Sequence, residues 1–114
     1  MRHRTPISKP DSESLDRELY SGLIRLHVLH HACEEPIFGM AMMEELGRHG
    51  YRLSAGTMYP VLHGLEKRGL LRSKSEQRDG RERRMYRATP LGRKTLRAAK
   101  RKVQELFGEL FEHD

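Results

Sequence analysis

The sequence of 114 residues contains no tryptophan and a single cysteine, Cys33. One cysteine excludes a disulfide within the chain and is typical of a reducing compartment, so we expect a cytoplasmic location. Aromatic residues make up only 6% of the chain, which argues against a large aromatic ligand pocket within one subunit. No apolar run approaches the roughly 18 residues of a membrane span, and no secretory leader is visible.

Positive charge is in excess, and it is concentrated in one part of the chain. Residues 66–102 contain 15 lysines and arginines against 4 acidic residues, a net charge of +11, whereas the other residues together carry −5. This asymmetry indicates an anionic partner for one region. Nucleic acid is the first candidate and an acidic membrane surface the second. A basic surface that only keeps the protein soluble remains an alternative.

Hydrophobic periodicity predicts three helices in the first 70 residues. Residues 1–14 are polar and contain prolines, so we expect a flexible arm. Ser14 is the expected N-cap of a first helix, which ends before Pro36. A second helix is expected at residues 37–48, and a third begins after Ser54 and ends at Gly69. The apolar stripes of the first two helices are Leu15, Leu19, Leu23, Ile24, Leu26, Val28 and Leu29, then Met40, Met43 and Leu46.

The period then changes from that of a helix to that of a strand. Residues 71–75 and 83–87 are predicted to be two short strands, and Asp79-Gly80 between them is a strong hairpin turn. Thr89-Pro90 is a typical start for a final helix that runs to about Phe111. The order predicts a mostly α-helical protein with a small β-hairpin (α+β). The fold class is a winged helix-turn-helix, residues 15–89, followed by a C-terminal dimerisation helix within residues 90–114.

The third helix contains residues that weaken helices, namely Gly56, Pro60 and Gly64. On a helical wheel they lie mainly away from the face formed by the apolar residues Met58, Val61, Leu62 and Leu65. Small or flat side chains allow the axis of a helix to approach a partner closely, such as a DNA major groove about 12 Å wide. Close packing against another helix of the same chain, or a proline kink in an exposed helix, is the alternative interpretation.

Three segments resemble the PadR family of bacterial transcriptional regulators. They are "LSAGTMYPVLHGLEKRGLL" (residues 53–71), "EEPIFGMAMMEEL" (34–46) and "RRMYRATPLGRKTL" (83–96). The resemblance extends from Gly22 to Leu96 and implies a DNA-binding repressor. The sequence departs from the family pattern at Glu35, Phe38 and Met40, none of which is a predicted groove-facing position.

The predicted DNA surface combines the third helix with the hairpin. Hydroxyl groups near the start of the helix suit phosphate or base-edge contacts, and the resemblance implies the same for Thr57 and Tyr59. Arginines around the hairpin turn suit a minor groove. The predicted DNA-binding residues are Ser54, Gly56, Thr57, Tyr59, Pro60, His63, Lys67, Arg78, Arg81, Arg83 and Arg84. Alternatively, Tyr59 is a partly buried core residue, and Lys67 and the arginines are solvated charges. Arg87 is a weaker candidate because it can pair with Glu66 or Glu76.

The last helix carries a coiled-coil pattern. Its apolar residues alternate in steps of three and four and are widened by Phe107 and Phe111. The predicted dimerisation residues are Leu96, Ala99, Val103, Leu106, Phe107 and Leu110. Packing against the chain's own first helix is the alternative. A homodimer predicts an inverted-repeat operator in double-stranded DNA with half-sites about 34 Å apart. An effector of unknown identity would act by changing the angle between the two last helices.

Histidines in the first helix suggest a different class of function. His27 and His31 are four residues apart, and His30 and Cys33 are three apart, so both pairs have spacings that can start a metal site. A metal-responsive regulator that also uses His49 or a dimer partner is therefore one alternative, and a protein–protein adaptor with a basic wing is another. A half-buried, satisfied His31 is the simpler interpretation, and we expect no metal and no cofactor. No catalytic constellation has convincing spacing, so we do not expect an enzyme.

Overall fold

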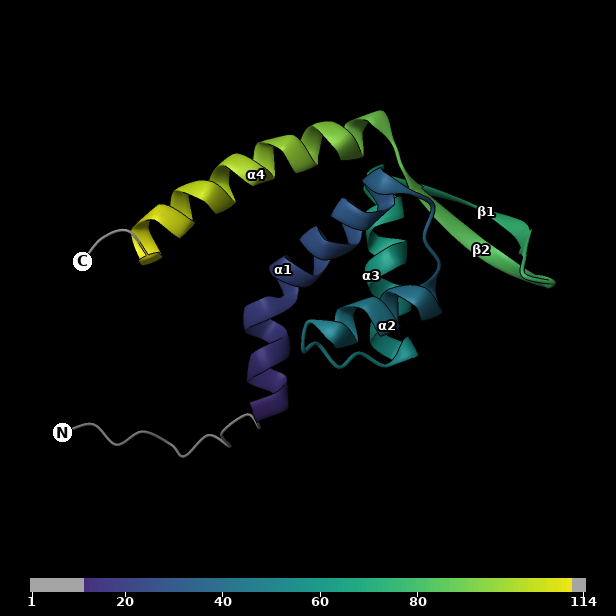
Figure 1. The fold of residues 1–114 in the computed structure, drawn as a ribbon, viewed down its shortest axis with the longest axis horizontal. Coiled ribbons are helices and arrows are strands. Elements are labelled where there is room, and N and C mark those ends of the chain that lie inside the picture. The colour runs from purple at the N-terminus through teal and green to yellow at the C-terminus, as the bar shows by residue number, and fades with distance from the viewer. Residues whose placement is uncertain (1–11, 112–114) are drawn as a thin grey trace.

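The structure, a computed structural model, describes residues 12–111, with side chains from residue 18 onward. The elements are α1 (Ser12–Glu34), α2 (Gly39–Arg48), α3 (Ala55–Lys67), β1 (Leu71–Arg78), β2 (Arg81–Ala88) and α4 (Pro90–Phe111). The three first helices form the body of the molecule, while the hairpin and the far end of α4 project on opposite sides of it (Figure 1). Within this range, no helix combines the length and the apolar character that crossing a membrane would require.

The hydrophobic core lies where α1, α2, α3 and the base of the hairpin meet. Leu46 from α2 and Met58 and Leu62 from α3 have no exposed surface, and Val28 from α1 and Leu71 from β1 pack into the same cluster. Full burial of one such side chain stabilises a fold by about 1.5–3 kcal/mol. The core therefore holds the three helices in one fixed arrangement.

The helix α1 begins at Ser12, two residues before the predicted start. Residues 1–11 of the predicted arm and the side chains of Ser14 and Leu15 lie outside the described residues. The predicted stripe is partly wrong, because Leu19 and Leu23 are exposed and Leu26 is half-buried, whereas Ile24, Val28 and Leu29 are buried. Leu23 faces the open groove between α1 and α4, whereas Ile24, Val28 and Leu29 pack into the core.

The helix α2 starts later than predicted, at Gly39. Ile37 is held in an extended segment because its backbone exchanges two hydrogen bonds with Tyr86, of 2.9 and 2.8 Å. The prediction that Met40 faces the core is wrong, since 57% of its surface is exposed. Leu46 is buried as predicted and Met43 is half-buried, and Met42 takes the buried position expected for Met40.

The hairpin and the start of α4 follow the predicted local signals. Both strands are longer than predicted, eight residues each, and the two turn residues Asp79 (φ 53°) and Gly80 (φ 76°) adopt the left-handed conformation of a type I′ turn. The Thr89 hydroxyl accepts a hydrogen bond from the N–H of Gly92 (3.0 Å) and so caps α4. A Cβ at Gly92 would lie 2.2 Å from the carbonyl oxygen of Leu70. The predicted winged helix-turn-helix with a C-terminal helix is confirmed.

Candidate nucleic-acid interface

The helix α3 has two distinct faces, as the helical wheel predicts. Met58, Leu62 and Leu65 are buried, whereas Gly56 and Pro60 are exposed on the other side. An added Cβ would meet only the Ser54 hydroxyl oxygen at Gly56, at 3.6 Å, and nothing within 4 Å at Gly64. No helix of the described chain packs against these glycines, so the alternative of close packing within the chain is wrong.

The N-terminus of α3 is open to solvent. Ser54 is the N-cap residue, and its carbonyl oxygen accepts hydrogen bonds from the N–H groups of Thr57 (3.0 Å) and Met58 (2.9 Å). Its hydroxyl makes no capping hydrogen bond, which corrects the prediction of a side-chain cap. The exposed hydroxyl and the N–H groups of Ala55 and Gly56, at the very start of the helix, therefore offer donors to an anionic group.

Tyr59 stands at the junction of α3 and α2. Its ring lies directly over Gly39, where an added Cβ would come within 2.6 Å of the phenol oxygen. The ring of His63 follows one turn later, with the two ring centres 6.3 Å apart. Tyr59 is thus packed on one side and exposed on the other. A glycine at position 39 is required for this placement.

Hydrogen bonds tie the hairpin to the end of α3. The Glu66 carboxylate accepts hydrogen bonds from the Ser73 N–H (3.1 Å) and from its hydroxyl (2.9 Å). The Ser73 hydroxyl oxygen in turn accepts a hydrogen bond from Arg84 of β2 (3.0 Å). Both strands are therefore oriented relative to α3. Sequence reasoning missed this network, because nothing in the pattern pairs a serine of a strand with a glutamate seven residues earlier.

On the opposite face of the hairpin, charged side chains contact one another and the Phe38 ring. Glu76 accepts hydrogen bonds from Arg87 (2.6 Å) and from Arg78 (3.3 Å), so Arg87 pairs with Glu76 as one of its two expected partners. The bond from Arg87 holds the pKa of Glu76 below its usual value, although burial opposes this shift. The guanidinium of Arg83 lies 4.2 Å from the centre of the Phe38 ring. Arg78 and Arg83 are consequently half-buried.

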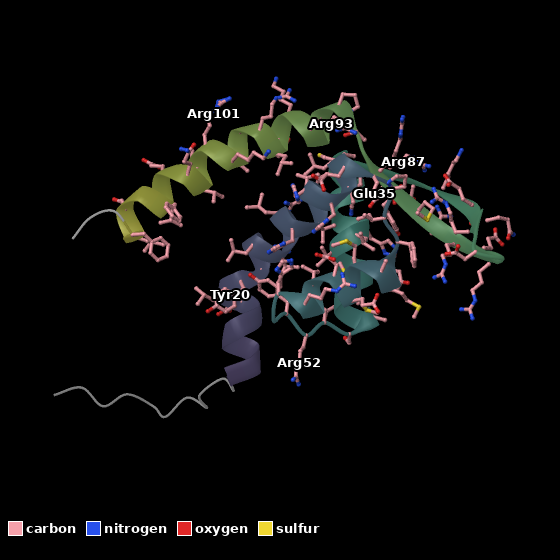
Figure 2. The ribbon with its side chains drawn as sticks, viewed as in Figure 1. Tyr20, Glu35, Arg52, Arg87, Arg93 and Arg101 are labelled. Carbon is pink, nitrogen blue, oxygen red and sulfur yellow. The ribbon has the colours of Figure 1, made fainter. Side chains whose placement is uncertain are left out.

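Most of the predicted DNA-binding residues are accessible. Thr57, Arg78 and Arg83 are half-buried. The exposed ones are Ser54, Gly56, Tyr59, Pro60, His63, Lys67, Arg81 and Arg84. Figure 2 adds Arg52, whose side chain projects outward from the turn that leads into α3. Sequence reasoning overlooked this arginine, although a basic residue two positions before a helix N-cap is a usable signal.

The apolar residues of α4 divide into two groups. Leu96 belongs to the core of its own chain, and Ala99 is half-buried. Val103, Leu106, Phe107 and Leu110 are 44–62% exposed. An open groove of about 460 Å³ between α1 and α4 continues this surface, with Leu23, Val103 and Phe107 among its lining residues. Packing against the chain's own first helix thus accounts for the first turns of α4 alone.

The histidines of α1 form a different group from the one that the metal-site alternative used, although the His27 and His31 rings are stacked with centres 6.5 Å apart. Ligand atoms of His30 and His31 lie close to a carboxylate oxygen of Glu34, all within 4.8 Å of one another. His27 instead lies against His49, with ring centres 4.9 Å apart. Cys33 is half-buried, and its carbonyl oxygen accepts a hydrogen bond from Arg93 (2.9 Å).

Comparison with known proteins agrees with this geometry. The model of the transcriptional regulator PadR-like family matches residues 28–98. The chain belongs to this family. The PadR-like chain is 50% identical over 94 residues to the transcriptional regulator Rv3488 of Mycobacterium tuberculosis, a match that covers 82% of this chain and 88% of the relative.

Solved structures of PadR proteins share the fold. A PadR family transcriptional regulator from Eggerthella lenta superimposes with a TM-score of 0.72 at 33% identity, covering 89% of this chain and 92% of the other. A PadR-like transcriptional regulator from Bacillus cereus gives a TM-score of 0.74 at 22% identity, covering 85% and 99%. The second likeness concerns the fold alone. The PadR-like protein described here is accordingly a winged-helix transcriptional regulator.

Proposed function

We propose that this PadR-like regulator binds operator DNA as a homodimer and acts as a repressor. The observation that carries the proposal is the exposed face of α3, which has no large side chain at Gly56 or Pro60, together with the exposed Arg81 and Arg84 of the wing. In the proposed complex α3 enters the major groove and the wing contacts the neighbouring backbone or minor groove. Lysine and arginine contacts supply most of the affinity, and α3 supplies the choice of sequence.

The dimer uses the exposed half of α4 and the groove beside it. A two-fold axis through this surface relates two recognition helices, so the operator is an inverted repeat with half-sites about 34 Å apart. Repression follows when the occupied operator overlaps a promoter and blocks the polymerase. An effector that alters the angle between the two α4 helices would change the half-site spacing or the affinity, and a ligand screen against the operator complex tests this.

The decisive experiment is selection from random DNA duplexes with the full chain. We expect an enriched inverted repeat, with log affinity falling steeply as log salt rises. Flat binding that is independent of sequence would favour an adaptor for an acidic protein and would reject the proposal.

Variants of α3 then separate sequence choice from general affinity. The double variant Thr57→Ala/Tyr59→Ala should reduce the preference for the selected site by about 10- to 100-fold, as expected when a base contact worth about 1–3 kcal/mol is lost. Lys67→Ala should weaken binding to selected and random duplexes equally, because a phosphate contact carries no sequence information. Unchanged selectivity in the double variant would remove α3 from its assigned role.

A further inference from the structure

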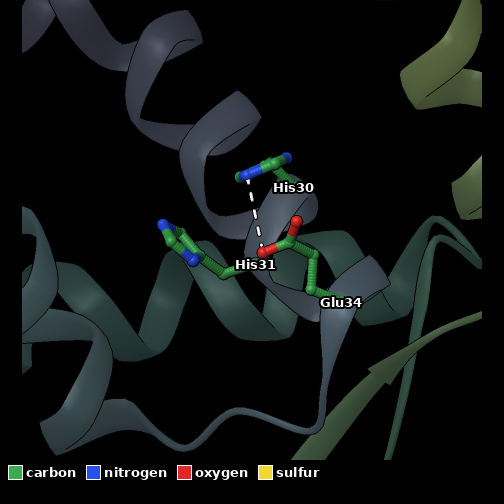
Figure 3. Close-up of side chains that lie close together, drawn as sticks. All are labelled: His30, His31 and Glu34. Atoms are coloured by element: carbon green, nitrogen blue, oxygen red, sulfur yellow. Dashed lines mark ion pairs between the residues drawn. The ribbon is translucent and has the colours of Figure 1, made fainter.

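We infer that a divalent transition-metal ion of the zinc type binds to His30, His31 and Glu34 at the C-terminal end of α1. In Figure 3 the Glu34 carboxylate faces the His30 ring, and His31 lies next to them on the same stretch of helix. One ligand atom from each residue lies within 4.8 Å of the others, and the His30 Nε2 atom is 3.8 Å from the Glu34 Oε1 atom. This inference does not depend on the proposed DNA binding.

The donor set fits the chemistry of zinc. Two imidazoles and one carboxylate, with a fourth position for water, form a usual open zinc site. Ligands about 2 Å from a tetrahedral ion lie about 3.3 Å apart. His30 and His31 are half-buried and Glu34 is exposed, so the proposed site closes from its present spacing by rotation of these side chains. Glu34 and His30 are exposed to water on their outer sides, so an ion can enter and leave, as a regulatory ion must.

A second carboxylate supports the central ligand. Glu45 from α2 places its Oε2 atom 3.7 Å from Nε2 of His31 and 3.2 Å from Nε2 of His49. The Nε2 side of His31 therefore faces this carboxylate at an ion-pair distance, and Nδ1 is left as the nitrogen for the metal.

The position of the site indicates which parts of the protein a bound ion would affect. His30 also lines the apolar groove between α1 and α4, which is the surface proposed for the partner subunit. On the other side, Glu45 and His49 belong to the end of α2, just before the turn into α3. An ion at His31 would therefore fix the end of α1 between the dimer surface and the DNA-reading helix.

The test is a titration of the metal-free full chain with Zn²⁺, and with Co²⁺, whose visible absorption reports its ligands directly. We expect His30→Ala and Glu34→Gln each to weaken binding by at least about 10-fold and to alter the Co²⁺ spectrum. His63→Ala, an exposed histidine on α3, is the matched control and should leave both unchanged. Glu34 is exposed, so its conservative variant keeps the fold, which thermal unfolding without metal verifies.

The competing location is the space between α1 and α2. If His49→Ala abolished binding while His30→Ala preserved it, the ion would be held by His31, Glu45 and His49, and the inference would be wrong. Absence of binding, or equal binding in every variant, would also overturn it. Loss confined to the His30 and Glu34 variants supports it.

Discussion

The winged-helix body and the outer half of α4 are built from the same kind of apolar pattern but differ in what covers it. In the body, Leu46, Met58 and Leu62 are completely enclosed by other residues of the chain. In the outer half of α4, Leu106 and Leu110 occupy equally regular positions, yet more than half of each side chain is exposed. A hydrophobic period predicts that a helix has an apolar face, but it does not tell which molecule covers that face.

Apolar burial therefore contributes to the folding of the chain in one region and to association with a second surface in the other. Apolar burial in the body stabilises the fold of the single chain, whereas apolar burial on α4 contributes only when a second surface arrives. The following variants test this division.

The largest expected effect is on the free energy of unfolding of the winged-helix body. Leu62→Ala removes a fully enclosed side chain and leaves a cavity, which should lower the free energy of unfolding by about 3 kcal/mol. Denaturant unfolding at a fixed protein concentration measures it. Leu110→Ala is the matched control and should change the stability of the monomer by less than about 0.5 kcal/mol. Equal losses for the two leucines would abolish the distinction between the regions.

The next largest effect is on association. Leu106→Glu places a charge in the centre of the exposed α4 surface and should weaken the proposed dimer by about 100-fold, which corresponds to about 3 kcal/mol. Sedimentation analysis over a range of concentrations measures it. Arg101→Glu is the control, because Figure 2 shows that Arg101 points away from α1 on the outer side of α4. A stable dimer of the Leu106 variant would show that the subunits meet elsewhere.

Local signals explain why so much of the fold is predictable from the sequence. Thr89-Pro90 at the start of α4 and Asp79-Gly80 in the hairpin turn require specific backbone conformations, and both occur where predicted. The start of α2 is not predictable in this way. It depends on the pairing of Ile37 with Tyr86, 49 positions later, and no local pattern carries that contact.

The candidate site shows the same limit. The open face of α3 follows from helical spacing alone, so Gly56 and Pro60 are placed correctly. The pairing of Arg87 with Glu76 is also among the predicted ones, but the contact of Arg83 is not, because it depends on the register of the hairpin and on Phe38 from another segment. Register sets Glu76 opposite Arg83, yet Arg83 turns to the Phe38 ring and Glu76 binds Arg87.

A smaller effect is expected when Gly56, on the exposed face of α3, is replaced by alanine. Gly56→Ala meets only the Ser54 hydroxyl, so it should stabilise the fold by up to about 0.5 kcal/mol through helix propensity. The same variant should weaken operator binding several-fold, because the methyl group keeps the helix away from the groove. Thermal unfolding and DNA titration measure the two effects. Gly47→Ala on α2, where an added Cβ meets nothing within 4 Å, should match the stability change and leave DNA binding intact.

The smallest effect concerns His27, which lies where the body meets the groove beside α4. Burial lowers its pKa below the usual 6.5, and the charges of His49, His31 and His30 add to this shift. The unfolded chain therefore binds a proton at a higher pH than the folded chain, so stability is full above pH 6.5 and falls as the pH drops through the folded pKa. His27→Gln should lose less stability than the wild type between pH 7.5 and 5.5 in thermal unfolding, whereas His63→Gln should follow the wild type. Identical pH profiles for all three proteins would show that acid acts on the body through other groups, and that the junction with α4 is not sensitive to protonation.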